Sequence, residues 1–171
     1  GRLPVTFYRT TEELPEFTDY SMENRTYRYM KNEALYPFGY GLSYTQFDYS
    51  DLKLSKTKVN IGEGFTISVK VTNTGKLAGE EVAQVYIKDV EASWAVPNWQ
   101  LSGIKRVKLE PGESKDISFE ILPEQLAVIN DEGQSIIEPG DFEVYVGGSQ
   151  PDTRSIKLTG KSPLKAVLKV E

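Results

Sequence analysis

The feature that most constrains the fold of this chain is an alternation of apolar and polar residues with a period of two. It runs through residues 65–71 and returns in residues 117–121, 142–146 and 156–158. Successive side chains of a β-strand point to opposite faces, so this pattern predicts strands that bury one face. Residues 81–87 are apolar on both faces, which is typical of a central strand of a sheet.

Turn-forming residues separate these runs. Asn-Thr-Gly occupies residues 73–75, Glu-Pro-Gly occurs at residues 110–112 and 138–140, and Gly-Gly-Ser occupies residues 147–149. Around seven short strands with this punctuation, and no long helix, predict an antiparallel sandwich. Because the Cys–Trp–Cys pattern of antibody domains is absent, we expect an all-β, fibronectin type III-like (immunoglobulin-like) β-sandwich.

The N-terminal part of the chain has a different composition, since eight of the 10 tyrosines lie in the first 49 residues. Residues 3–7 alternate and predict one short strand, and residues 25–30 predict another extended run. Residues 36–44 contain two Gly and one Pro, which preclude regular structure, but they are too aromatic for a flexible linker. We therefore predict an irregular, aromatic-rich extension in residues 1–46 and the sandwich in residues 47–171.

The chain contains neither Cys nor His. Their absence excludes disulfides, thiolate nucleophiles, Ser-His-Asp triads and the metal sites that need either residue. The formal net charge of −5 argues against nucleic-acid binding, and no apolar run approaches the roughly 18 residues of a membrane-spanning helix. We expect no cofactor, no metal, no nucleic-acid partner and no membrane partner. The compartment, cytoplasmic or secreted, stays open.

The sequence resembles one known family along almost its whole length. Residues 1–7 resemble the last strand of the second catalytic-core domain of glycoside hydrolase family 3. Residues 25–29, and the specific run Leu-Tyr-Pro-Phe-Gly-Tyr-Gly-Leu-Ser-Tyr-Thr-Gln-Phe at 35–47, are similar to the linker that follows this core. That linker leads to a C-terminal fibronectin type III-like domain. Four further motifs of this sequence, at residues 73–75, 79–86, 110–113 and 138–144, are similar to strands and turns of that domain.

The resemblance implies a role in carbohydrate breakdown. Members of the family are retaining β-glycosidases such as β-glucosidases and β-xylosidases, with an Asp nucleophile in a barrel domain and usually a Glu acid/base in the second domain. Both would lie upstream of Gly1, so no catalytic residue is carried over to this chain. We therefore expect a non-catalytic accessory region of an O-glycosyl hydrolase that acts on plant polysaccharides or oligosaccharides. Its partners would be the catalytic domains of the same polypeptide, on which it would pack and which it would stabilise.

Two tryptophans, Trp94 and Trp99, lie in a connection that is long for a sandwich and follows the predicted central strand. Exposed aromatic rings stack on sugars, so an independent carbohydrate-binding module that uses both tryptophans is an alternative function. The favoured interpretation is docking of this loop on the catalytic domains. Local packing within the loop is the third interpretation.

Charged residues provide further candidates. Arg25 and Arg28 lie among tyrosines, and we interpret them as inter-domain packing and cation–π residues, with contact to substrate as the alternative. Glu80 and Glu81 are the most tempting carboxylate pair. Adjacent strand residues point to opposite faces, so the pair cannot flank one glycosidic bond, and we expect both to be solvated charges at the start of a strand.

Overall fold

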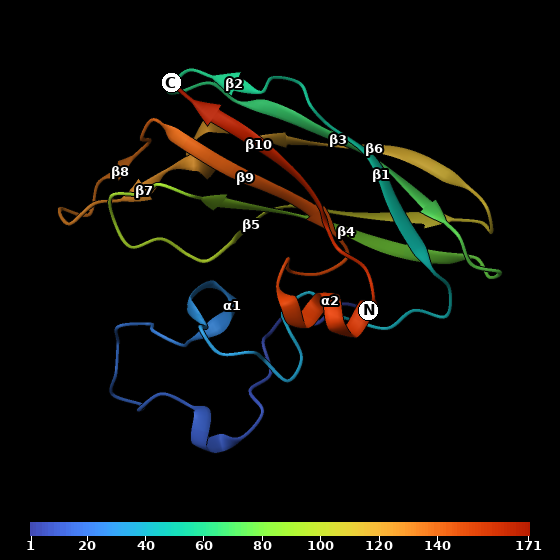
Figure 1. The fold of residues 1–171 in the computed structure, drawn as a ribbon, viewed down its shortest axis with the longest axis horizontal. Coiled ribbons are helices and arrows are strands. Elements are labelled where there is room, and N and C mark those ends of the chain that lie inside the picture. Colours follow the sequence, from blue (N-terminus) through green and yellow to red (C-terminus); the bar gives the residue numbers. More distant parts are fainter.

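A computed structural model describes residues 1–171. Two β-sheets pack face to face as a sandwich, and the N-terminal extension and both α-helices lie on one side of it (Figure 1). The α-helices are α1 (Thr26–Tyr29) and α2 (Thr153–Thr159), and Thr11–Glu13 and Pro123–Leu126 form short 3-10 helices. The strands are β1 (Phe47–Leu54), β2 (Lys58–Val59), β3 (Phe65–Asn73), β4 (Gly79–Asp89), β5 (Gln100–Leu109), β6 (Ser114–Ile121), β7 (Val128–Ile129), β8 (Ser135–Ile136), β9 (Gly140–Gly147) and β10 (Leu164–Val170).

The strands form two main sheets. One contains three strands in the order β1-β3-β6, and the other contains five in the order β2-β10-β9-β4-β5. Strands β7 and β8 pair with each other as a separate ribbon. Three of the ten strands, β2, β7 and β8, have only two residues, which leaves seven longer strands. This agrees with the number that the alternating runs and turns predict.

The period-two alternation correctly predicts which side chains face inward. Along β3, Phe65, Ile67, Val69 and Val71 are at most 4% exposed, whereas the residues between them are exposed or half-buried. They belong to a cluster of 20 buried apolar residues between the two sheets. Fully burying one such side chain stabilises a fold by about 1.5–3 kcal/mol. The predicted all-β sandwich is confirmed.

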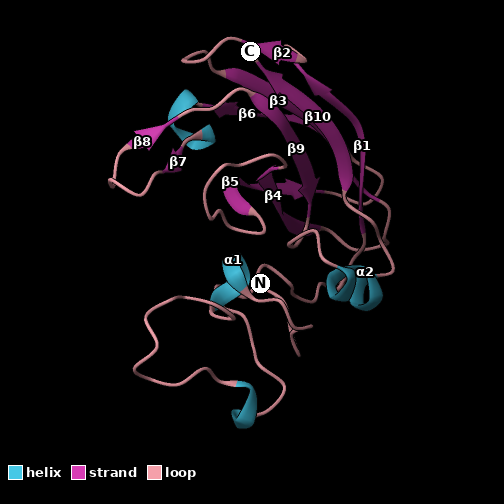
Figure 2. Cartoon of the chain, turned by 60° about the vertical axis from the view of Figure 1, so that its left-hand side comes forward, coloured by secondary structure: helices cyan, strands magenta, loops and turns pink.

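Strand β4 is central, as the sequence predicts, because it pairs with β5 on one side and β9 on the other. Ala83 and Val85 on its inner face belong to the core cluster. Gln84 and Tyr86, on its outer face, are also buried, at 2% and 1% exposure. No second layer of strands covers this outer face. The N-terminal extension covers it instead, below β4 and β5 in Figure 2.

The prediction of a strand at residues 156–158 is wrong, because these residues lie in helix α2. The carboxylate of Asp152 accepts a hydrogen bond of 2.6 Å from the backbone N–H of Ser155 and caps the helix N-terminus. Gly160 ends the helix in the left-handed conformation, with φ of 68°. These two residues are helix boundary signals that outweigh the brief alternation of Ile156 and Leu158.

The extension follows an irregular but hydrogen-bonded path. The backbone N–H of Leu3 donates to the carbonyl of Tyr40, and that of Gly39 donates to the carbonyl of Leu3, both at 2.8 Å. Phe7 N–H donates to the carbonyl of Tyr36 at 2.9 Å, and these two residues form an isolated β-bridge. The predicted strand at residues 3–7 is therefore reduced to one bridge within a loose antiparallel pairing.

The second extended run predicted in the extension, at residues 25–30, is also wrong. Its central residues form the single turn of α1, and the backbone N–H of Met30 closes that turn on the carbonyl of Thr26 at 3.0 Å. Neither α1 nor any other helix of the structure is long and apolar enough to cross a membrane.

Candidate functional site at the joint between extension and sandwich

The outer face of β4 holds the extension through buried polar groups. The Gln84 side-chain amide donates to the carbonyl oxygens of Gly39 and Gly148, at 3.1 and 2.9 Å. The hydroxyl of Tyr86 donates to the Gln84 side-chain oxygen at 2.6 Å. Burial raises the pKa of the Tyr86 phenol, so this group remains a neutral donor. Gln84 therefore connects the extension, β4 and the segment after β9.

Aromatic rings continue this contact toward β5. The ring of Tyr27 stacks on Phe38 with centroids 4.3 Å apart, and it meets the ring of Tyr86 edge-on at 6.1 Å. The Tyr27 hydroxyl accepts a hydrogen bond of 3.1 Å from the backbone N–H of Leu101. Aromatic pairs of this kind are worth about 0.5–1.5 kcal/mol beyond their area of burial. The tyrosines that make the N-terminal composition unusual thus serve partly to attach the extension to the sheet.

On the inner face of β4, Glu81 forms a buried ion pair with the beginning of the extension. The guanidinium nitrogen Nη2 of Arg2 lies 2.6 and 2.5 Å from the two carboxylate oxygens of Glu81. The Tyr49 hydroxyl donates to Glu81 Oε1 at 2.7 Å. Burial, together with the negative charge of Glu81, raises the pKa of Tyr49 well above its ordinary value. Arg2 also donates to the carbonyl of Gly41 at 2.8 Å, so its side chain links the end of the extension to β4.

The interpretation of Glu80 and Glu81 needs one correction. The two side chains do point to opposite faces, as expected, and Glu80 forms an exposed ion pair of 3.1 Å with Arg106. Glu81, however, is 1% exposed and is not a solvated charge. It has the same parity as Ala83 and Val85, which lie in the core. Because side chains alternate along a strand, Glu81 points inward. There, its carboxylate is stabilised by Arg2 and Tyr49.

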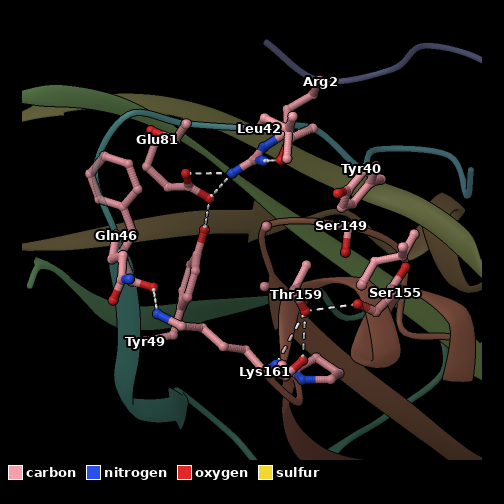
Figure 3. Close-up of a pocket in the computed structure, with 18 of the residues that line it drawn as sticks. Arg2, Tyr40, Leu42, Gln46, Tyr49, Glu81, Ser149, Ser155, Thr159 and Lys161 are labelled. Atoms are coloured by element: carbon pink, nitrogen blue, oxygen red, sulfur yellow. Dashed lines mark hydrogen bonds and ion pairs between the residues drawn. The ribbon is translucent and has the colours of Figure 1, made fainter. Parts of the chain in front are cut away.

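A pocket of about 520 Å³ lies beside this ion pair, and we call it the joint pocket. Its walls come from the extension, from the segment after β9 and from α2 with the residues that follow it (Figure 3). Arg2 and Glu81 lie at one side of the joint pocket, and Tyr40, Ser149 and Ser155 lie at another. No group of three or more carboxylate, Cys or His side chains in the structure could hold a metal ion.

The structure places Trp94 and Trp99 in the loop between β4 and β5, away from the joint pocket, and both are half-buried. Between them, the backbone N–H of Asn98 donates to the carbonyl of Arg28 at 2.6 Å. The Asn98 side-chain amide donates to the carbonyl of Met30 at 3.0 Å. The loop is therefore attached to the α1 region of the extension. Its roles in docking or sugar binding remain predictions.

Neither Arg25 nor Arg28 lines the joint pocket. Arg25 Nη2 donates to the carbonyl of Glu16 at 2.6 Å within the extension. The Arg28 guanidinium lies 5.9 Å from the centroid of the Tyr29 ring, the cation–π geometry that its aromatic neighbours suggest. Arg28 Nε is buried and has no hydrogen-bond partner. Only Arg28 therefore lies near the loop that carries the two tryptophans.

The comparison with protein families matches part of the sandwich. Residues 81–150 match the family described as Fibronectin type III-like domain. This chain contains a fibronectin type III-like domain. The match begins at Glu81 and ends at Gln150, so it covers most of β4, all of β5 to β9 and several residues of the joint pocket.

Relatives of this fibronectin type III-like chain are much longer proteins. A putative β-xylosidase of Formosa agariphila is 40% identical over 156 residues, which cover 89% of this chain and 20% of that protein. A periplasmic β-glucosidase of Salmonella typhimurium is 41% identical over 159 residues, which cover 86% of this chain and 21% of that protein. The structure of β-glucosidase 3B from Thermotoga neapolitana matches with a TM-score of 0.83 and 34% identity, covering 99% of this chain and 24% of that one.

These findings confirm the resemblance to glycoside hydrolase family 3. The chain, with its fibronectin type III-like domain, corresponds to a region of such β-glycosidases and spans about a fifth of the length of the relatives it matches.

Sequence reasoning missed the residues that build the joint. Arg2, Tyr49 and Gln84 do not stand out by type, and Glu81 stood out only as a carboxylate that was expected to be solvated. One signal was available, because a charged residue at the inward parity of a predicted central strand requires a buried partner. The identity of that partner is not readable from the strand, since Arg2 lies 79 residues away in sequence.

Proposed function

We propose that this chain is the non-catalytic, C-terminal accessory region of a longer retaining β-glycosidase. In this proposal, the extension in residues 1–46 packs on the catalytic domains, and the sandwich in residues 47–171 supports it. The match to about a fifth of several β-xylosidases and β-glucosidases supports membership of such a parent. Retention requires two carboxyl groups about 5–5.5 Å apart. The buried carboxylate of the joint, Glu81, is already paired with Arg2, so we assign catalysis to the rest of the parent.

The observation that carries this proposal is the distribution of exposed apolar side chains. Of the 16 large hydrophobic residues that are exposed, nine lie in the first 46 residues and seven in the remaining 125. The most exposed are in the extension: Tyr44 at 97%, Phe17 at 90%, Tyr20 at 86% and Leu42 at 79%. The extension is nevertheless attached to β4 at Gly39 and to the loop after β4 at Arg28 and Met30. Apolar side chains presented to solvent on such a fixed scaffold indicate a surface that another protein part covers.

The test is to produce the upstream part of the parent and this chain as two separate polypeptides. The melting temperature of the upstream part, and its hydrolysis of aryl β-glucosides and aryl β-xylosides, are measured with and without the chain. We expect the chain to raise the melting temperature and to have no activity alone. The double variant Phe17→Ser/Tyr20→Ser should lose this effect, because it removes apolar contact area without touching the core of the chain.

Ile104→Ser is the matched control, because Ile104 is 64% exposed on β5 of the sandwich. It should stabilise the upstream part as well as the unchanged chain does. The proposal is wrong if the upstream part melts at one temperature whether or not the chain is present. It is also wrong if the chain alone hydrolyses either substrate.

A further inference from the structure

The joint pocket has the size and position of a ligand-binding site. Its volume of about 520 Å³ falls within the roughly 300–1,000 Å³ of typical small-molecule sites. It is formed where three separate segments meet: the extension up to β1, the turn after β9, and α2 with its following loop. An occupant would therefore contact the extension and the sandwich at once.

The formal charges around the joint pocket are already neutralised within the chain. Arg2 and Glu81 pair with each other at 2.5 Å. The ammonium group of Lys161 donates to the carbonyl of Phe47 at 2.7 Å and forms an ion pair with Asp48. No unpaired charge therefore remains among these groups to attract an ionic ligand. The binding capacity that is left is neutral.

Two buried neutral groups at the joint pocket have no hydrogen-bond partner. They are the hydroxyl of Ser155 and the side-chain oxygen of Gln150, in residues that are 3% and 5% exposed. The other end of the Gln150 amide is used, because its Nε2 donates to Asp152 at 2.7 Å. A buried polar group without a partner destabilises the fold, so a ligand that pairs with it gains affinity. Ser149 adds a half-buried hydroxyl group next to them.

Aromatic side chains supply the other half of the site. Tyr40, Phe47 and Tyr49 line the joint pocket. The ring of Tyr40 is held parallel to that of Tyr36, at 6.0 Å between centroids and 3° between planes, so it forms a positioned surface. Neutral hydrogen-bonding groups beside aromatic rings suit a ligand that presents hydroxyl groups on one face and C–H groups on another.

From this combination we infer that the joint pocket binds a neutral carbohydrate of one or two sugar units. The hydroxyls of the sugar would pair with the half-buried hydroxyl of Ser149 and, once their side chains rotate toward the joint pocket, with the unpaired groups of Ser155 and Gln150, and its C–H face would lie against the ring of Tyr40. The polar and aromatic groups argue for this ligand without reference to the parent enzyme, while the choice of glucose- and xylose-based probes rests on the proposed function. The site is distinct from the loop with Trp94 and Trp99, which does not line the joint pocket.

The experiment is a calorimetric titration of the 171-residue chain with glucose, xylose, cellobiose and xylobiose. We expect saturable binding of at least one of them. Ser149→Leu should abolish binding by filling the joint pocket. Ser155→Ala should weaken it about fivefold, the effect of losing one neutral hydrogen bond. Ser118→Leu is the matched control, because Ser118 is exposed on β6 outside the joint pocket, and it should bind like the unchanged chain.

Circular dichroism establishes that each variant is folded before titration. The inference is overturned if the folded chain binds none of the four sugars, or if Ser149→Leu binds as well as the unchanged chain. It is also overturned if inorganic phosphate binds in place of the sugars, because the site would then recognise anions. None of these outcomes depends on whether the chain stabilises an upstream part, so the two proposals can fail separately.

Discussion

Arg2 and Glu81 form an ion pair that joins the first residues of the extension to the inner face of the central strand. The closest atoms are 2.5 Å apart, and the two side chains are 18% and 2% exposed. A carboxylate at this depth is tolerated only with a partner, because removing an ion from water costs several kcal/mol. The pair therefore makes the folding of the sandwich depend on the position of the extension.

Arg2→Met should destabilise the chain by about 3–5 kcal/mol, because it leaves the carboxylate of Glu81 buried and uncompensated. Urea unfolding followed by circular dichroism measures this free energy. Arg2→Met/Glu81→Leu should recover much of the loss, since the double change removes both charges. As a control, Arg106→Met breaks the exposed pair with the adjacent Glu80 and should cost about 0–1 kcal/mol. Equal effects of Arg2→Met and Arg106→Met would contradict the buried pair.

Gly39→Ala should detach the extension from β4. Gly39 has φ of 76°, and a Cβ atom there would lie 2.2 Å from Gln84 Oε1 and 2.9 Å from the Tyr86 hydroxyl. The substitution at Gly39 combines backbone strain from the positive φ with a steric clash. Gly62→Ala has the backbone strain alone, because Gly62 has φ of 85° but nothing within 4 Å of an added Cβ. Backbone strain alone should destabilise either variant by about 1–2 kcal/mol. Hydrogen exchange should accelerate at the Leu3 amide in Gly39→Ala and stay slow in Gly62→Ala.

Tyr49→Phe should flatten the alkaline pH profile of stability. The pKa of Tyr49 is raised in the fold, so above pH 10 the unfolded chain releases this proton while the folded chain retains it. The free energy of unfolding therefore falls as pH rises, by about 1.4 kcal/mol per pH unit for such a group. Urea unfolding between pH 10 and 12 should show a slope that is less steep by this amount in Tyr49→Phe. The same substitution at Tyr44, which is 97% exposed, should leave the slope unchanged.

The roles of Trp94 and Trp99 can be separated by fluorescence. Both side chains are half-buried, so iodide should quench their emission partially. If the loop docks on catalytic domains, Trp94→Ala/Trp99→Ala should lower the melting temperature of the parent enzyme and leave this chain nearly unchanged. If the two indoles form a sugar platform, oligosaccharide should shift the emission of the chain to the blue. A much lower melting temperature of the chain alone would instead indicate local packing.

Most of the sandwich could be predicted because the signals for strands and turns depend on neighbouring residues. The alternation along residues 65–71 faces one side of β3 inward, Pro111-Gly112 follows the end of β5, and Pro139-Gly140 leads into β9. The prediction fails where the local pattern is short. Ile156 and Leu158 alternate over three residues only, whereas Asp152 and Gly160 bound a helix, so capping decides the structure of α2.

Local sequence suffices to predict an all-β sandwich with a central strand at residues 81–87, because a period of two is a property of neighbouring residues. The segment that covers the outer face of that strand, and the cation that pairs with Glu81, become visible only in the folded chain. Arg2 and Glu81 are 79 residues apart, and Gln84 bonds to Gly39, which is 45 residues away. Such pairs depend on where the whole chain folds back, and no local spacing of residues records that path.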